Sequence, residues 1–384
     1  MPAWKDDPAV LICDHGACDH ESCDHGAAGQ GPAGQGSCDH GPGGRPPDER
    51  ARPAADVLRW SRQLLDPALR DAVEAMPDAA RRIAAYHFGW RDELGRPASG
   101  AAGKAIRPAL ALLAAQAVGG TAAAALPAAV AVELAHNFSL LHDDVMDGDP
   151  TRRHRPTAWT VFGENAAILA GDGVLAAAYE VLAADDSAAA AHGVRILARA
   201  VLDLVEGQSA DLAFEDRTDV TLDECLTMAG RKTGALMGAA CALGACFGGA
   251  SAAGTARLRA FGECFGLAFQ LADDLLGIWG DPAATGKPVH SDLHNRKKSL
   301  PVVAALTSGT PAGAELARLY FRDGPLTGDD TARAAGLIEA AGARTWAADH
   351  ARALLAEART HLAGAAPAPA AELRALGGLM ALRE

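Results

Sequence analysis

Residues 140–148, Leu-Leu-His-Asp-Asp-Val-Met-Asp-Gly, and residues 269–277, Phe-Gln-Leu-Ala-Asp-Asp-Leu-Leu-Gly, each follow a long apolar run and close at a glycine. Both runs have helical periodicity, so we expect two buried helices with acidic residues at their C-terminal ends. Asp143 and Asp147 are four residues apart, which places them on one helix face about 6 Å apart along the axis. The two stretches therefore predict two acidic clusters brought together by helix packing.

These acidic clusters need positive charge beside them, because a helix C-terminus itself carries partial negative charge. Carboxylate oxygens suit Mg²⁺, which keeps several waters and links carboxylates to the phosphates of a substrate. Basic residues follow or accompany both clusters, in segments 103–107, 152–153, 286–287 and 296–298 and at Lys232. Singly, each is an ordinary surface charge, but together they could hold two diphosphates. The alternative interpretation is a pair of solvated helix ends.

The composition predicts a large all-α domain. The chain has 384 residues, is rich in Ala and Leu, and contains only 5% aromatic residues. Helical periodicity runs from about residue 54 nearly to the end, and Gly- and Pro-rich breaks divide it into roughly ten helices. We therefore expect residues 53–384 to form a single large helical bundle of about ten or more helices.

The charge and the apolar pattern exclude several classes of protein. The chain carries 35 Lys and Arg against 48 Asp and Glu, a net charge of −13. Nucleic acid is therefore not expected as a partner, since binding its backbone needs a basic surface. The apolar stretches are interrupted and the N-terminus lacks a signal-peptide pattern, so we expect no transmembrane segment and a cytoplasmic protein. Four cysteines in apolar helical stretches fit a reducing compartment: Cys225, Cys241, Cys246 and Cys264.

Residues 1–52 form a distinct segment of low complexity. The triplet Cys-Asp-His begins at Cys13, Cys18, Cys23 and Cys38, always in register with a five-residue period. Gly, Ala, Gln and Pro fill much of the remainder, so this segment cannot bury a core and we expect it to be disordered. Three roles stay open: a plain extension, a metal site made by Cys and His, or an arm whose repeated motifs dock on a partner.

In order and spacing, these motifs resemble those of the trans-isoprenyl diphosphate synthases, most of all the bacterial geranylgeranyl and farnesyl diphosphate synthases. The similarity covers about residues 57–384. Residues 143–147, followed by Arg152 and Arg153, resemble the first aspartate-rich motif of the family, and residues 273–277 resemble the second. The remaining matches are the isopentenyl diphosphate motif at residues 103–108, His136, Gly207-Gln208, Lys232-Thr233 and Thr285-Gly286-Lys287.

The resemblance implies an isoprenoid-synthase fold and a prenyltransferase that condenses isopentenyl diphosphate with an allylic diphosphate, head to tail. Three Mg²⁺ ions would be bound with the allylic diphosphate by Asp143, Asp147 and Asp273, supported by Asp144 and Asp274. Lys232 and Lys287 would complete the catalytic set. Other residues implied to hold or face the allylic substrate are Arg152, Thr233, Gln208 and Gln270. Those implied to hold isopentenyl diphosphate are Lys104, Arg107, His136 and Arg153.

Two residues before the first motif predict the length of the product. Phe138 and Ser139 lie five and four residues before Asp143, and no residue is inserted within the motif. In the family that it resembles, an aromatic residue followed by a small one is typical of geranylgeranyl diphosphate synthases. The pattern therefore favours a medium-chain product, C20 first and C15 second. The plain alternative for Phe138 is an ordinary core residue.

The sequence departs from the family pattern at three positions. Gly277 stands where the second motif often has its last Asp, so one carboxylate is missing on that side. Asp281, four residues further on, is a poorly placed substitute. His154 follows the paired arginines where glycine is common, and Ile106 stands where a polar residue is often found.

Two other functions share part of this pattern. A class I terpene cyclase has the same fold, but it needs no isopentenyl site and usually carries an Asn/Ser/Glu triad in place of the second Asp cluster. A non-catalytic subunit of a heteromeric prenyl synthase would be expected to lose carboxylates. The resemblance also implies a homodimer. The N-terminal segment resembles the arms of encapsulin cargo proteins, so a protein shell is a further candidate partner through residues 1–52.

Overall fold

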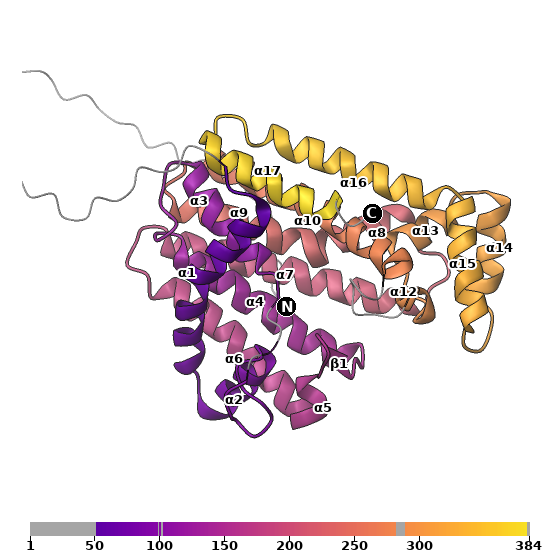
Figure 1. The fold of residues 1–384 in the computed structure, drawn as a ribbon, viewed down its shortest axis with the longest axis horizontal. Helices are drawn as coiled ribbons and strands as arrows, with labels where there is room; N and C mark the ends of the chain where they lie inside the picture. Colours follow the sequence, from indigo (N-terminus) through magenta and orange to yellow (C-terminus); the bar gives the residue numbers. More distant parts are fainter. Residues whose placement is uncertain (1–50, 99, 101–102, 282–288, 382–384) are drawn as a thin grey trace, which may run out of the picture. The chain divides into compact units, whose positions relative to one another are not determined.

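The computed structural model describes residues 51–98, 100, 103–281 and 289–381, in which nearly all regular structure is helical (Figure 1). The predicted all-α bundle is confirmed. Residues 1–50, with the Cys-Asp-His repeat, and Lys287 lie outside the described residues. The helices of the first half are α1 (Ala54–Glu74), α2 (Asp78–His87), α3 (Ile106–Ala117), α4 (Leu126–Met146), α5 (Ala158–Phe162), α6 (Glu164–Ala183) and α7 (Ala190–Glu215). Those of the second half are α8 (Leu222–Ala229), α9 (Ala235–Phe247), α10 (Ala252–Trp279), α12 (Ser291–His294), α13 (Leu300–Leu306), α14 (Pro311–Tyr320), α15 (Gly328–Ala340), α16 (Ala343–Thr360) and α17 (Pro367–Ala381).

Helix α4 carries the first acidic stretch and is apolar around most of its circumference. Such a helix is stable only inside a protein, and α4 packs between α3, α6 and α9. It ends at Met146, with Asp147 as its C-cap. Gly148 follows with a φ of 64°, the left-handed conformation that glycine adopts at helix ends. The first acidic cluster therefore stands at a helix C-terminus, as the sequence predicts.

Helix α10 carries the second acidic stretch and ends at one of the Gly- and Pro-rich breaks that divide the chain. The helix runs on past Gly277 to Trp279, and Gly280 is its C-cap. The residues after Gly277 stay helical because Ile278 continues the apolar face of the helix and is fully buried. Asp273 and Asp274 thus lie inside the helix, so they oppose its dipole less than residues in the last turn would.

Small residues bring the central helices unusually close together. A Cβ atom on Gly244 of α9 would lie 2.7 Å from the carbonyl carbon of Ala111 in α3. On the other side of α9, a Cβ on Gly262 of α10 would lie 2.8 Å from the Cα of Gly238. Because only glycine permits these approaches, α9 is wedged between α3 and α10. This contact sets the spacing between the elements that line the site described below.

Helices α12 to α15 build a second, smaller apolar core around Tyr320, Leu316 and Ile338. Figure 1 shows these helices grouped at one end of the helical domain, away from α2 and α5. Ile278 at the end of α10 and Leu293 of α12 belong to this core. The end of the second acidic helix is thereby fixed to the segment that follows it.

A short hairpin follows α4, formed by strands β1 (Thr151–Arg152) and β2 (Arg155–Pro156). Its two turn residues, Arg153 and His154, have φ values of 51° and 61°. This conformation is characteristic of a two-residue type I′ turn and favours Gly or Asn, which explains why a glycine at position 154 would be the ordinary choice. Arg155 holds the hairpin in place by donating hydrogen bonds to the carbonyls of Tyr86 (3.0 Å) and Arg91 (3.1 Å).

Helix α6 is the one described helix that is long and apolar enough, by length and composition, to cross a membrane. A core helix passes the same test, and α6 packs along α4, α2 and α7.

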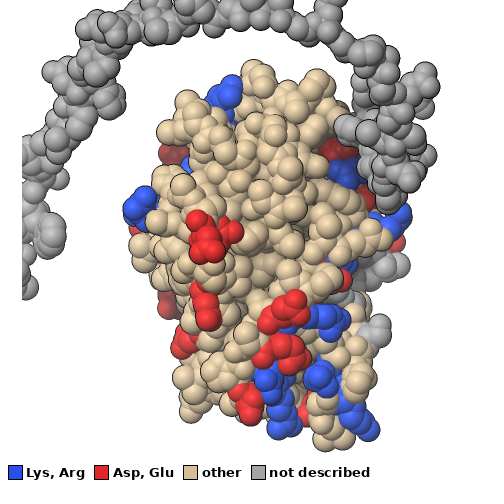
Figure 2. All heavy atoms as spheres, turned by 90° about the vertical axis from the view of Figure 1, so that its left-hand side faces the viewer, with Lys and Arg blue, Asp and Glu red and all other residues tan. Residues whose placement is uncertain are grey.

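The surface in Figure 2 is largely uncharged over its upper part. Acidic and basic side chains gather together at its lower edge, so positive charge forms no continuous stripe on this face.

Candidate active site

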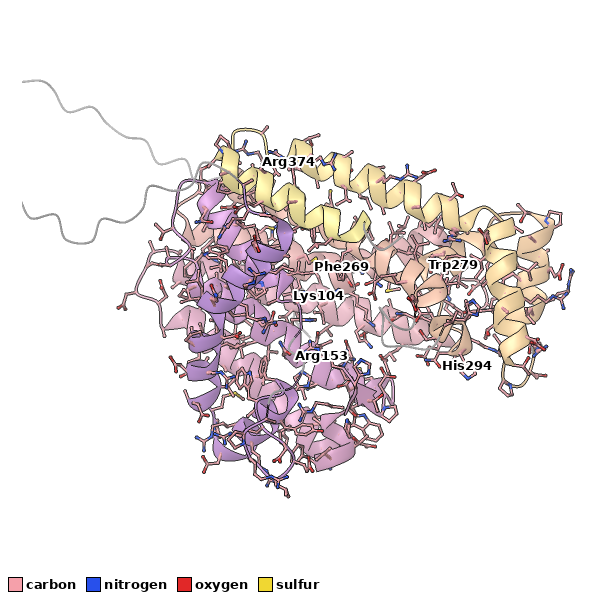
Figure 3. The ribbon with its side chains drawn as sticks, viewed as in Figure 1. Lys104, Arg153, Phe269, Trp279, His294 and Arg374 are labelled. Atoms are coloured by element: carbon pink, nitrogen blue, oxygen red, sulfur yellow. The ribbon has the colours of Figure 1, made fainter. Side chains whose placement is uncertain are left out.

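A cavity of about 310 Å³ opens where the start of α3 and the β-hairpin meet helices α4, α7, α9 and α10. Figure 3 shows Lys104, Arg153 and Phe269, which come from three separate segments, in the middle of the bundle. The cavity brings together most of the predicted site residues: Lys104, Arg107, His136, Ser139, Asp143, Arg152, Arg153, Lys232, Thr233, Gln270 and Asp273. Segments separated by up to about 170 residues in the sequence thus share one pocket.

The first aspartate cluster is largely buried, and Arg152 is the basic residue that forms a direct ion pair with it among the described residues. Asp144 is 1% exposed and accepts a 2.6 Å hydrogen bond from Arg152 Nε at its Oδ1. Its Oδ2 is buried and has no hydrogen-bond partner among the described residues. Burial raises the pKa of Asp143 to about 6, Lys232 opposes this effect, and Asp147 adds to it. A cluster of this kind stabilises bound cations.

The second cluster is held by a chain of hydrogen bonds. Thr233 Oγ1 donates to Gln270 Oε1 (2.6 Å), and Gln270 Nε2 donates to Asp274 Oδ1 (2.8 Å). The backbone N–H of Leu300 donates to Asp274 Oδ2 (2.9 Å). Asp274 is 3% exposed, and burial raises its pKa to about 6. Asp273 is exposed and lines the cavity, so its carboxylate is accessible from the pocket, whereas Asp274 is hydrogen-bonded within the protein.

The donor chemistry of these aspartates fits Mg²⁺, which prefers carboxylate oxygens and waters. Within the described ranges, the one group of three Cys, His, Asp or Glu residues whose ligand atoms all lie within 4.8 Å of one another is Cys264, Glu357 and His361. The site aspartates are therefore too far apart for three of them to share one ion. They would hold Mg²⁺ ions whose positive charge offsets the negative charge of a substrate diphosphate.

Lys232 lies on a π-helical turn, η1 (Gly230–Gly234), between α8 and α9. Such turns occur mostly at functional sites because they shift side chains out of helical register. Gly207 of α7 allows the turn to approach, since a Cβ there would lie 2.8 Å from the Cα of Lys232. Lys232 Nζ forms a 2.6 Å ion pair with Asp211. The sequence analysis missed Asp211, because nothing in the local pattern of α7 distinguishes it from a surface acid.

A second group of basic residues surrounds the other part of the cavity. Burial lowers the pKa of Arg107 to about 10, although Glu133 raises it. Burial, together with Arg107 and Arg153, lowers the pKa of His136 well below 6.5, so its imidazole is neutral at pH 7. The guanidinium of Arg153 lies over Gly103. Its Cζ atom is 3.1 Å from the place that a Cβ at Gly103 would take. Desolvated cations grouped in this way bind an anion strongly.

Two other neighbours of the site, His87 and Lys297, were not among the predicted site residues. His87 of α2 lies 3.2 Å from Asn137 Oδ1, and burial with the nearby Arg153 and Arg152 lowers its pKa to about 3. Lys297 is surrounded by carboxylates. Burial alone would lower the pKa of Lys297, but Asp274, Asp292, Asp211 and Asp273 raise it. Only the position of Lys297 after the second acidic stretch suggested a role.

The remaining wall of the cavity is apolar and is formed by Leu140, Leu204, Leu236, Met237 and Phe269. Ser139 belongs to the lining, but Phe138 does not. Phe138 is buried against His142, with ring centroids 4.7 Å apart. Gln208 is also outside the lining, and both atoms of its buried amide have no hydrogen-bond partner in the described part of the chain.

The comparisons with known proteins agree with this arrangement. Residues 90–335 match the family model described as polyprenyl synthetase. The chain is 48% identical, over 334 residues, to a (2E,6E)-farnesyl diphosphate synthase of Mycobacterium tuberculosis, covering 86% of this chain and 93% of that protein. It is also 48% identical to a geranylgeranyl diphosphate synthase of the same organism, covering 74% and 82%. A crystal structure of a polyprenyl synthetase from Streptomyces coelicolor superposes with a TM-score of 0.82 at 46% identity, covering 85% of this chain and 99% of that one.

The family match covers most of the helical domain, and the similarity to the named farnesyl diphosphate synthase covers most of both chains. The enzymes of this family use Mg²⁺, in keeping with the donor set of the two clusters. The chain therefore belongs to the polyprenyl synthetase family, the trans-isoprenyl diphosphate synthases, and is a prenyltransferase of chain elongation.

Proposed function

We propose that this enzyme condenses isopentenyl diphosphate with an allylic diphosphate to give geranylgeranyl diphosphate (C20) as its main product and farnesyl diphosphate (C15) as the second. One observation supports this most: two aspartate clusters and a separate group of desolvated cations face the same cavity, whose remaining wall is apolar. Two diphosphates can then be held at different places, with their hydrocarbon parts between them.

The described residues divide between these two binding places. Asp143, Asp147 and Asp273 would hold about three Mg²⁺, which when bound neutralise the diphosphate as it leaves. Lys232 and Arg152 stabilise the same developing negative charge. In the second place, Lys104, Arg107 and Arg153 hold isopentenyl diphosphate, and the neutral His136 donates one hydrogen bond to it.

Chain elongation then needs little more from the protein. The isopentenyl double bond attacks the allylic carbon, and the released diphosphate takes the proton that is lost, so no side-chain base is required. The apolar wall, including Phe269 and Met237, keeps water from the cationic carbon. Gln270 and Thr233 fix Asp274, and Lys287 is proposed to join the diphosphate site from outside the described residues.

The product length rests on Phe138 and Ser139. Ser139 lines the cavity one helical turn before Asp143, and the larger Phe138 is buried beside it. The relatives named above make both C15 and C20 products by their names, so they support a medium chain without choosing between the two. Replacing Phe138 by Ala should lengthen the product, as read by mass spectrometry, and an unchanged product distribution would remove the basis of this assignment.

The assay that tests the function supplies Mg²⁺, isopentenyl diphosphate and each allylic diphosphate in turn. We expect products that are longer than the primer by whole five-carbon units. Cyclic products formed without isopentenyl diphosphate would favour a terpene cyclase instead. No elongation with any primer would favour a non-catalytic subunit.

A homodimer is part of the proposal. Four large apolar side chains are exposed on the adjacent helices α6 and α7: Ile168 (38%), Leu169 (67%), Leu202 (61%) and Val205 (47%). Exposed apolar groups on neighbouring helices favour association. Light scattering should give twice the chain mass, and Leu169→Asp together with Leu202→Asp should shift it to that of a single chain.

Residues 1–52 are proposed to be a separate segment that turnover does not need, in a cytoplasmic protein. The segment could be a plain extension, a metal site or a docking arm. If it is a docking arm, the partner that we propose is a protein shell such as an encapsulin. Deleting these residues should leave elongation intact. Lost elongation would make the segment part of the catalytic domain.

A further inference from the structure

The second aspartate-rich motif lacks a carboxylate at a specific place in space. Asp143 and Asp147 share one face of α4 because they are four residues apart. Asp273 and Gly277 have the same spacing on α10, so a side chain at position 277 would point in the direction of Asp273. Gly277 provides no side chain there, and the pair on α10 is incomplete.

A carboxylate from another helix fills this place. A Cβ atom built on Gly277 would lie 2.5 Å from Cγ and 2.8 Å from Oδ1 of Asp292, and closer still to its Oδ2. Asp292 belongs to α12, fifteen residues further along the chain. Its carboxyl group therefore occupies the volume in which an aspartate at position 277 would begin.

The surrounding structure holds Asp292 in this position. The backbone N–H of Lys297 donates to the carbonyl of Asp292 (2.9 Å), and Tyr320 donates from its hydroxyl to the carbonyl of Lys297 (2.8 Å). Leu293, the next residue, is fully buried in the same apolar core as Ile278. Trp279 is the last residue of α10 and His294 is the last residue of α12. In Figure 3 both lie on the same side of the domain.

Asp292 also belongs to the same charge cluster as the motif aspartates. Lys297 interacts with Asp292, Asp273 and Asp274, which outweigh the effect of its burial and raise its pKa. Lys297 also lowers the pKa of Asp147 in the first motif, against the effect of burial. One ammonium group therefore lies within electrostatic reach of both aspartate clusters and of Asp292.

We propose that Asp292 supplies the carboxylate that the second motif lacks at Gly277, and that Asp273 and Asp292 together bind the metal on the α10 side of the site. The inference rests on the proposed function and names the residue that completes its metal site. It also fits the glycine, since an aspartate at position 277 would have to displace the carboxylate of Asp292. Asp281, which the sequence offered as the substitute, is exposed beyond the end of α10.

The test measures Mn²⁺ binding to the full chain by electron paramagnetic resonance, with an unreactive thio-analogue of an allylic diphosphate present. Asp292→Asn should weaken the binding of one ion by about 10- to 100-fold, the usual effect of removing a group that holds or orients a metal ligand. Asp281→Asn is the matched control and should leave binding unchanged. Thermal unfolding confirms that each variant is folded.

A double variant separates a role of the carboxylate in metal binding from a role of Asp292 in folding. Gly277→Asp alone should displace the Asp292 carboxylate, whereas Gly277→Asp combined with Asp292→Gly moves the carboxylate from α12 to α10 and should recover most of the affinity that Asp292→Asn loses. Wild-type binding in Asp292→Asn, or an equal loss in Asp281→Asn, would overturn the proposal. If the double variant does not fold, the comparison of the two Asn variants decides alone. Elongation by the wild type tests the proposed function separately, because the Mn²⁺ measurement requires no turnover.

Discussion

Asp143 should lower the stability of the metal-free protein, because the fold buries its carboxylate for function. Its pKa rises from the ordinary 3.8 to about 6. The difference is about two units, and at about 1.4 kcal/mol per unit it sets an upper limit near 3 kcal/mol. The side chain is partly exposed, so solvent screening reduces this value. We expect Asp143→Asn to stabilise the metal-free protein by about 1–2 kcal/mol at pH 7.5.

The stability that Asp143→Asn gains over the wild type should increase as the pH rises. Well below pH 3.8 the carboxyl group is protonated in both the folded and the unfolded chain, so the variant gains nothing there. Between pH 4 and 6 the unfolded chain loses its proton first, and the wild type becomes progressively less stable than the variant. Above pH 6 the difference is complete.

Urea denaturation in a chelating buffer at pH 7.5 and pH 4.5 measures this difference. Asp186→Asn, on an exposed surface loop, is the matched control and should change little at either pH. The thermal midpoint of Asp143→Asn should rise by about 2–4 °C at pH 7.5. No gain at pH 7.5, or an equal gain at pH 4.5, would refute the reasoning. The same variant should bind Mn²⁺ more weakly, since it removes a proposed ligand.

Three further predictions concern the packing, the hairpin and the second substrate. Gly244→Val should unfold the protein or destabilise it by more than about 3 kcal/mol, because a Cβ there would collide with Ala111; circular dichroism measures the loss. His154→Gly should raise the free energy of unfolding by about 1 kcal/mol, since φ at this position is 61°, whereas an unchanged denaturation midpoint would contradict the assigned strain. Arg153→Met should raise the KM for isopentenyl diphosphate about tenfold or more and change that for the allylic substrate far less; steady-state kinetics with each substrate varied in turn would show equal effects if the two binding places were assigned wrongly.

Much of the fold could be predicted because it depends on local patterns. The apolar circumference of α4 and the glycine after it fix both its burial and its end. The second acidic stretch closes at Gly277, but the apolar contacts of Ile278 carry α10 on to Trp279, and the helix ends at the break that begins with Gly280. Helix ends depend on tertiary contacts, which periodicity alone does not contain.

The candidate site was predictable where residues stand within motifs and not where packing brings isolated residues in. Arg107, Lys232 and Asp273 share one cavity, as their motifs imply. Asp292 lies beside Gly277, and Asp211 beside Lys232, only because α12 and α7 pack there, and no spacing in the sequence records those contacts.

The most direct test of prenyl transfer is a single-turnover measurement with excess enzyme. Farnesyl diphosphate and isotopically labelled isopentenyl diphosphate are mixed with the enzyme and Mg²⁺, and the product is identified by mass spectrometry. We expect the wild type, and not Asp143→Asn, to form a C20 diphosphate that carries one labelled five-carbon unit. Farnesyl diphosphate that is recovered unchanged, or is converted without taking up label, would contradict it.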